Sequence, residues 1–157
     1  MPVINLETKI NAPVERVFDL SRCIDLHEAT MTDHKEKAVA GVRKGLINLN
    51  ETVTWEAVHF GVRQRLTSKI TVYNRPHHFR DSLVSGAFKR FDHDHFFEET
   101  GGMTVMRDVF DYDSPYSILG TFADRLFLES YMKKLLENRN ALIKRIAESD
   151  DWKRFLK

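Results

Sequence analysis

Two histidines in one short segment are the residues of this chain best suited to chemistry. Residues 91–98 read Phe-Asp-His-Asp-His-Phe-Phe-Glu, an alternation that predicts a strand with His93 and His95 on its apolar face. The next strand-like segment, 104–112, carries Asp108 among apolar residues on the corresponding face. Titratable groups that face an apolar interior form a hydrogen-bonded core network, orient a ligand in a pocket, or catalyse a reaction.

Two more carboxylates occupy comparable positions. Asp81 lies between Phe79 and Leu83, and Glu51 lies between apolar residues of an earlier segment. A carboxylate held against an imidazole prepares a general base near neutral pH. Such a pair could enolise a carbonyl substrate, promote an aldol-type cyclisation or assist a dehydration. The candidates for catalysis are His95, His93, Asp108, Asp81 and Glu51, and a network that only satisfies buried groups remains an open alternative.

A metal site is a further alternative. His93 and His95 place two imidazoles side by side, and Asp108 could add a carboxylate from the neighbouring strand. Two histidines and one carboxylate can bind zinc or iron. However, His-x-His pairs often arise by chance, and the aspartates at 92 and 94 indicate simple alternation. We therefore predict no metal and no cofactor.

The bulk composition bounds the class of protein. The chain has 157 residues, 42% hydrophobic and 30% charged, which is typical of one soluble globular domain, here 1–157. A net charge of +1 gives no reason to expect nucleic acid. Cys23 is the only cysteine, which excludes intrachain disulfides and Cys-rich zinc sites. The sequence shows neither a signal peptide nor an apolar segment long enough to cross a bilayer, so we expect a cytoplasmic protein without membrane insertion.

The expected secondary structure follows from hydrophobic periodicity. A first strand is followed by a short helix that begins near Asn11 and Pro13, and Ser21 could cap a second short helix. Thr100-Gly-Gly102 predicts a hairpin between the last two strands. Short connections favour an antiparallel meander. Strands are expected at 4–10, 47–56, 62–72, 79–85, 91–98 and 104–112.

The last third of the chain changes to a helical period. Apolar residues recur every three or four positions from Ile118 to Ile146, which predicts a helix of roughly 30 residues, and 114–117 supply capping residues at its start. The fold class is therefore α+β, with a curved antiparallel sheet of about six to seven strands wrapped around a long C-terminal helix. Two short helices follow the first strand. Space between the sheet and the helix is a natural pocket.

Several local motifs carry a resemblance to a known family. The sequences of these motifs and their order along the chain resemble those of the START-like superfamily, also called Bet v 1-like or SRPBCC, and in particular of its bacterial polyketide cyclase/dehydrase-like branch. The resemblance covers essentially the whole chain and implies a helix-grip fold. It implies little about function, because the superfamily includes carriers, receptors and enzymes. The motifs are residues 10–18, 51–61, 79–86, 91–96, 104–108 and 114–120.

These observations favour a binding function. The chain has 11 phenylalanines and shows no nucleophile or cofactor motif, so we predict that a hydrophobic small molecule (a lipid, an isoprenoid or quinone, or an aromatic polyketide-like compound) binds in the cavity. The alternative is a cyclase/dehydrase-type enzyme that uses a His–carboxylate pair there. The protein is expected to be a monomer or homodimer. The predicted ligand-binding residues are Trp55, Phe79, Phe91, His93, His95, Met106, Asp108, Phe110, Leu119, Phe122 and Leu126.

Overall fold

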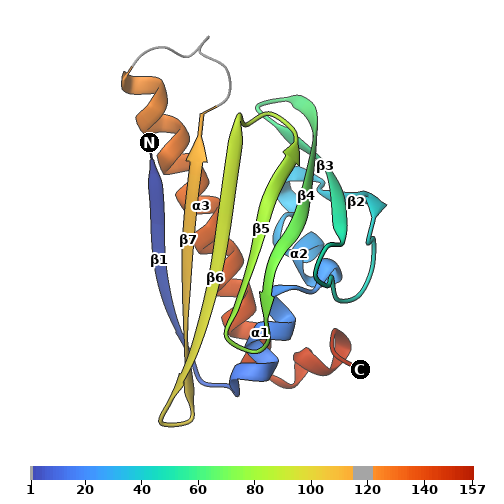
Figure 1. The fold of residues 1–157 in the computed structure, drawn as a ribbon, viewed down its shortest axis with the longest axis vertical. Coiled ribbons are helices and arrows are strands. Elements are labelled where there is room, and N and C mark those ends of the chain that lie inside the picture. Colours follow the sequence, from blue (N-terminus) through green and yellow to red (C-terminus); the bar gives the residue numbers. More distant parts are fainter. Residues whose placement is uncertain (1, 115–121) are drawn as a thin grey trace.

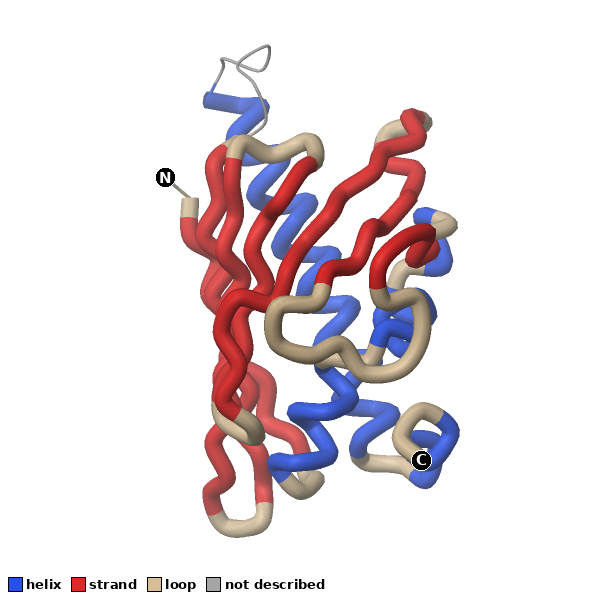
Figure 2. Tube along the Cα trace, turned by 45° about the vertical axis from the view of Figure 1, so that its right-hand side comes forward, coloured by secondary structure: helices blue, strands red, loops and turns tan. Residues whose placement is uncertain are grey.

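The computed structural model describes residues 2–114 and 122–157. Within them, seven strands form one curved antiparallel sheet, and the helices lie on one side of it (Figures 1 and 2). The strands are β1 (Val3–Ile10), β2 (Lys37–Gly41), β3 (Thr52–His59), β4 (Val62–Asn74), β5 (His78–Ser85), β6 (Arg90–Thr100) and β7 (Met103–Asp113). The helices are α1 (Val14–Ser21), α2 (Ile24–Thr30) and α3 (Phe122–Ala147), with 3-10 turns η1 (Thr32–His34) and η3 (Asp150–Arg154).

The strand order brings the predicted site residues together. The sheet runs β1-β7-β6-β5-β4-β3-β2, so β6 lies between β5 and β7. His93 is paired with Asp81 of β5, and His95 is paired with Asp108 of β7. Residues directly opposite each other on neighbouring strands project to the same face of a sheet. The register therefore places both histidines and both aspartates on the face that the helices cover.

The helices confirm the predicted pattern of two short helices and one long one. The long helix α3 has 26 residues and crosses the concave face of the sheet (Figure 1). Pro13, not Asn11, holds the N-cap position of α1, with extended φ and ψ of −60° and 146°. The predicted capping of the second short helix by Ser21 is wrong, because Ser21 ends α1 and Cys23 holds the N-cap position of α2. The backbone N–H of Asn11 instead donates to Glu148 at the far end of the chain. None of the described helices is both long and apolar enough to cross a membrane.

Two segments differ from the expected strands. Residues 47–51 precede β3 as a loop, in which Asn50 has a positive φ of 66° and Glu51 Oε2 accepts a 2.7 Å hydrogen bond from the backbone N–H of Asn48. That local bond closes a turn, and it removes Glu51 from the strand face that the alternation predicts. In contrast, β2 is a short edge strand that the sequence did not reveal, because five residues give too little periodicity.

The core consists of two apolar clusters with polar residues between them. In the larger cluster, Phe18 of α1 packs edge-to-face on Phe79 and Phe97, with ring centroids 5.3 and 5.2 Å apart. The smaller cluster includes Phe91, at the other end of β6. Each aromatic pair is worth about 0.5–1.5 kcal/mol beyond its buried area. Between Phe91 and Phe97, the inward positions of β6 are the two histidines, so the polar residues interrupt an otherwise apolar face.

Candidate functional site

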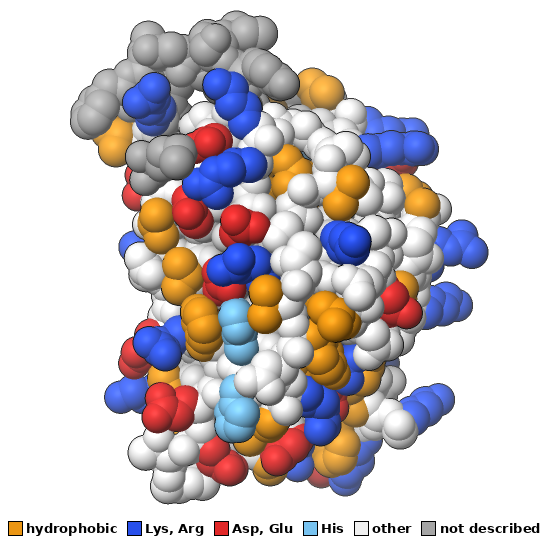
Figure 3. Space-filling view, viewed as in Figure 1, with side chains coloured by type: hydrophobic (Ala, Val, Ile, Leu, Met, Phe, Trp, Pro, Cys, Tyr) orange, Lys and Arg blue, Asp and Glu red, His pale blue; other side chains and the backbone are white. Residues whose placement is uncertain are grey.

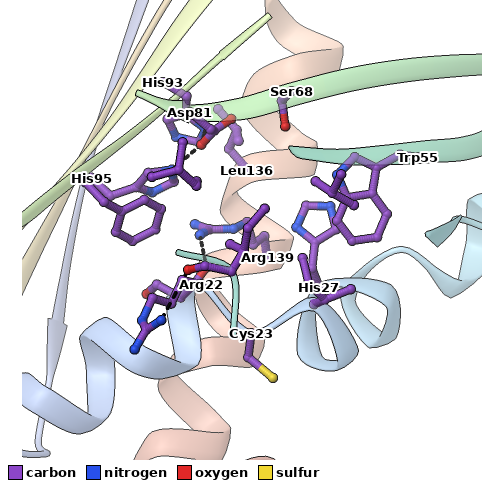
Figure 4. A pocket seen from close by; sticks show the side chains of 16 residues that line it. Arg22, Cys23, His27, Trp55, Ser68, Asp81, His93, His95, Leu136 and Arg139 are labelled. Atoms are coloured by element: carbon purple, nitrogen blue, oxygen red, sulfur yellow. Dashed lines mark hydrogen bonds and ion pairs between the residues drawn. The ribbon is translucent and has the colours of Figure 1, made fainter. Parts of the chain in front are cut away.

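A small pocket opens between the helices and the sheet. Its volume is about 110 Å³, and its walls come from α1, α2, α3 and strands β3 to β6 (Figure 4). Most of the wall is apolar, but one end is formed by His93, His95, Asp81 and Arg139. The arrangement is that of a ligand pocket in which a few polar groups fix the orientation of an apolar molecule. The main apolar residues are Ile47, Val53, Trp55, Ile70, Phe79 and Leu136.

The polar end is built around two histidines from β6. His95 Nε2 lies 2.8 Å from Asp81 Oδ2, and His93 Nδ1 lies 4.0 Å from the same oxygen. The rings are packed together, with centroids 3.9 Å apart. His95 also stacks on Phe79 at 4.2 Å, which fixes its ring plane. Three potential metal-ligating atoms, from Asp81, His93 and His95, therefore lie within 4.8 Å of one another.

Asp108 supports both histidines from behind. Its Oδ1 lies 3.1 Å from His93 Nε2 and 2.9 Å from His95 Nδ1. The first contact is a hydrogen bond, whereas the second is close but poorly aligned, which leaves His95 Nδ1 without a hydrogen bond among the described residues. Asn140 of α3 donates a 2.7 Å bond to Asp108 Oδ2. The carboxylate is 1% exposed and is held by groups on two elements.

Arg139 links this cluster to the helices. Its Nη1 donates to Asn140 Oδ1 at 2.9 Å and lies 3.5 Å from Asp108 Oδ1, while Nη2 donates to the backbone carbonyl of Ser21. None of these contacts uses the Nε–H. Figure 4 shows the guanidinium reaching from α3 into the middle of the pocket. The cluster therefore has a positive group on the wall opposite the two carboxylates.

The charges of the cluster follow from its contacts. Burial favours the neutral form of every group, but the contacts with His93 and His95 and the charge of Arg139 hold the pKa of Asp108 well below its usual range. Burial opposes ionisation of Asp81 most strongly, but the bond from His95 together with the charges of His93, His95 and Arg139 lowers its pKa. Burial also opposes charge on His95, yet the two carboxylates raise its pKa. For His93, burial and the neighbouring His95 charge lower the pKa. These directions favour ionised aspartates and place the proton on His95 in preference to His93.

The other end of the pocket has a different character. His27 of α2 stacks on Trp55 with centroids 4.3 Å apart, and its Nε2 lies 2.6 Å from Glu36 Oε1. Cys23 is buried, and burial raises the pKa of its thiol. Arg22 donates to the side chain of Asp19 and to backbone and side-chain oxygens of the loop before β3. These groups form the wall of the pocket and are satisfied by one another.

The structure brings together four of the five catalytic candidates. His93, His95, Asp81 and Asp108 form the polar cluster, whereas Glu51 lies in the loop before β3, away from it. The first three line the pocket, and Asp108 lies behind the histidines. The hypothesis that Glu51 shares their face is wrong because the chain turns before β3 begins.

The predicted ligand-binding residues other than Asp108, which lies behind the histidines, divide into four groups. Trp55 and Phe79 line the pocket, together with the two histidines. Others are buried elsewhere: Phe91 and Phe110 pack in the smaller apolar cluster, and Met106 is fully buried with its sulfur 3.5 Å from Ser21 Oγ. The prediction fails for Leu126, which is 52% exposed. Leu119 and the side chain of Phe122 lie outside the described residues, as do the expected capping residues 115–117.

Sequence reasoning missed two residues of the polar cluster. Arg139 and Asn140 are 6% and 3% exposed although they lie in a helix rich in charged residues. A signal was present, because both fall at helical spacing between Leu136 and Ile143, which are buried. A charged and a polar residue on the buried stripe of a helix require partners on the facing sheet, and the ionised Asp108 is that partner.

Comparison with known proteins gives matches of fold. No family model and no curated protein matches the chain. A START superfamily protein from Mycobacterium smegmatis matches with a TM-score of 0.70 and 10% identity, over 93% of this chain and 97% of that one. The protein TTHA0849 from Thermus thermophilus gives 0.69 and 19%, over 90% and 97%. Ginseng major latex-like protein 151 from Panax ginseng gives 0.66 and 12%, over 94% and 98%. At such identities the likeness shows the fold alone.

Proposed function

We propose that this chain, which has the START-like helix-grip fold, binds a compact and largely apolar organic molecule whose polar group meets His93 and Arg139. The observation that carries the proposal is an apolar pocket closed at one end by a charge-balanced polar cluster. Pockets for drug-sized ligands measure about 300–1,000 Å³. The volume of about 110 Å³ therefore favours a small ring compound, the compact end of the predicted ligand range, over a long acyl or isoprenoid chain.

The polar cluster suggests the chemistry of the ligand's polar group. Because His93 Nε2 donates to Asp108, the Nδ1 of the neutral ring keeps a lone pair that can accept a hydrogen bond. The Nε–H of Arg139 can donate one. An oxygen that both donates and accepts, such as a phenol or enol hydroxyl, would satisfy both groups. A carbonyl oxygen would use only the arginine.

Direct identification of a ligand tests the proposal. Native mass spectrometry of gently purified protein is expected to show a bound organic molecule, and phenols and cyclic enols should quench or shift Trp55 fluorescence more strongly than fatty acids of similar hydrophobicity. Ser68 lines the pocket, so Ser68→Phe should fill it and reduce affinity at least tenfold. The control Val84→Phe adds a ring at a position that is 58% exposed and should leave affinity unchanged. Equal affinity of both variants would reject the pocket.

Proton-transfer catalysis is a second candidate, because a neutral His93 backed by Asp108 is arranged as a general base. Its Nδ1 would take a proton from the carbon next to a ligand carbonyl, and the C–H electron pair would form a carbon–carbon double bond. The carbonyl π pair would then move to the oxygen, and the Arg139 Nε–H would stabilise the resulting enolate. Returning the proton to the same carbon completes an exchange. This role agrees with the resemblance to the cyclase/dehydrase-like branch, which stays a prediction.

Deuterium exchange separates catalysis from binding. In heavy water, a bound cyclic ketone should gain deuterium next to its carbonyl much faster with the wild type than without protein. His93→Gln should abolish the exchange, whereas His27→Gln, which changes another histidine of the pocket wall, should retain it. Exchange that persists in His93→Gln, or that never occurs although the ketone binds, would eliminate this candidate and leave binding as the function.

A further inference from the structure

We propose that Asp81, His93 and His95 form a binding site for a divalent transition-metal ion of the Zn²⁺ or Fe²⁺ class, with its remaining coordination positions open to the pocket. Asp81 Oδ2 lies 2.8 Å from His95 Nε2 and 4.0 Å from His93 Nδ1, and all three atoms lie within 4.8 Å of one another. A metal bound at about 2.1 Å holds its donor atoms about 3.0–3.4 Å apart. Shifts of about 1 Å would therefore bring the three atoms to coordination distance.

The orientation of the imidazoles supports this site. His93 Nε2 and His95 Nδ1 both face Asp108, at 3.1 and 2.9 Å, so the other nitrogen of each ring faces Asp81. When both N–H groups point toward Asp108, two ring lone pairs and a carboxylate oxygen converge on one point. In the metal-free protein the proton of His95 Nε2 separates that nitrogen from Asp81 Oδ2, and a bound cation would take its place. The geometry thus provides a place for a cation as well as its ligands.

Asp108 and its partners complete the pattern of a metal site. Histidines that bind metals usually donate their other ring N–H to a carboxylate, which fixes the tautomer and makes the ligand nitrogen more basic. Here one buried carboxylate lies against both rings: it is hydrogen-bonded to His93 Nε2, lies 2.9 Å from His95 Nδ1, and is anchored by a 2.7 Å bond from Asn140. The sequence suggested Asp108 as a metal ligand, but the structure places it behind the rings and brings Asp81 to their front.

The open side of the site faces the pocket. Asp81, His93 and His95 all line it, so an ion would have three protein ligands on one side and the ligand cavity on the other. Two histidines and one carboxylate with open positions are typical of zinc and non-haem iron sites that bind a substrate oxygen. Once a metal ion displaces the proton of His95, the single positive charge of Arg139 does not balance the two aspartates, so the surroundings of the ion carry a net negative charge.

Metal titration of the full chain tests the inference. Protein stripped with a chelator and then dialysed should bind one Co²⁺ per chain, with visible absorption bands of a four- or five-coordinate ion, and Zn²⁺ should displace it. In the wild type, Zn²⁺ should shift the ring NMR signals of His93 and His95 and leave those of His78 unchanged. Asp81→Asn and His93→Gln should each weaken binding by at least the 10–100-fold seen for outer partners of metal ligands.

The matched control lies on the opposite face of the sheet. His78 also contacts an aspartate, Asp94, at 2.7 Å, but it lies outside the pocket, so His78→Gln should bind Co²⁺ as the wild type does. Binding only in the millimolar range, six-coordinate spectra, or NMR shifts at His78 would overturn the inference. The wild-type NMR measurement keeps the test valid if a variant fails to fold.

The metal site does not depend on the proposed organic ligand, and the two can fail separately. Ligand titrations of the chelator-treated protein measure the organic molecule alone, and Co²⁺ titrations without additives measure the metal alone. Ser68→Phe should weaken binding of the organic molecule and leave Co²⁺ binding unchanged. Loss of both in that variant would mean that the substitution disrupts the polar cluster, and Co²⁺ binding in the wild type would then decide the inference.

Discussion

Two His–Asp–Arg clusters lie on opposite faces of the sheet around β5 and β6, and they differ mainly in what surrounds them. On the outer face, Asp94 Oδ1 and Oδ2 accept bonds from Arg80, and Oδ1 lies 2.7 Å from His78 Nε2. This face carries charges of both signs and turns toward the viewer in Figure 3. On the inner face, Asp108 is 1% exposed and holds two histidines. The outer cluster is partly hydrated, whereas the inner one must balance its charges internally.

This difference explains why only the inner cluster is a candidate site. On the outer face Asp94 is only 8% exposed, but its partners Arg80 and His78 reach water, so these ion pairs are partly screened and contribute about 1 kcal/mol. Inside, removing one partner leaves the others buried and uncompensated, which costs about 3–5 kcal/mol. The inner cluster is therefore sensitive to any added proton, metal ion or ligand, and it borders a pocket through which these can enter.

The largest predicted effect on stability is the difference between Asp108→Asn on the inner face and Asp94→Asn on the outer face. Asp108→Asn should destabilise the protein by about 3–5 kcal/mol, because it leaves the charges of His95 and Arg139 buried against a neutral amide. Asp94→Asn should cost about 1 kcal/mol. Urea unfolding of both variants at neutral pH measures the difference. Equal costs would mean that the inner and outer clusters are energetically alike.

A smaller effect is expected for His95 and His93, whose contributions to stability should change with pH in opposite directions. Because the pKa of His95 is raised in the folded protein, its contribution is complete below the unfolded-state value of about 6.5 and is lost as the pH rises through the folded-state pKa. The pKa of His93 is lowered, so its contribution is present above about 6.5 and is lost as the pH falls through the folded-state pKa.

Unfolding measured between about pH 5 and 9 tests these opposite trends. The cost of His95→Gln should be about 1.5–3 kcal/mol at the acidic end, as for hydrogen bonds to charged groups, and should shrink toward the alkaline end. The cost of His93→Gln should grow in the same direction. Parallel trends for the two variants would contradict the assignment of the proton to His95.

The smallest effects are expected where sequence and structure disagree. Glu51→Gln and Leu126→Ser should each change stability by no more than about 0.5 kcal/mol, because one residue lies in a loop and the other is 52% exposed. Neither should alter ligand or Co²⁺ binding. A loss of binding in Glu51→Gln would restore the sequence-based hypothesis that this carboxylate belongs to the site.

Much of the fold and part of the site could be predicted from the sequence. Strict alternation in 91–98 and 104–112 was sufficient to place His93, His95 and Asp108 on one buried face, since side chains alternate along a strand. The same reasoning failed at Glu51, because a side chain-to-backbone bond made a turn that periodicity does not register. It also failed at Leu126, because a helix stripe does not reveal how far the sheet extends beneath it.

Within the regular strands, the sequence by itself determined which residues face inward, because periodicity is a local property of the chain. Only the tertiary structure decided what those residues meet. The pairing of β5 with β6 brought Asp81 to the front of the imidazoles, the pairing of β6 with β7 put Asp108 behind them, and the rotation of α3 about its axis brought Arg139 and Asn140 against the cluster. Strand register and helix rotation are set by packing over the whole chain, and a single segment does not encode them.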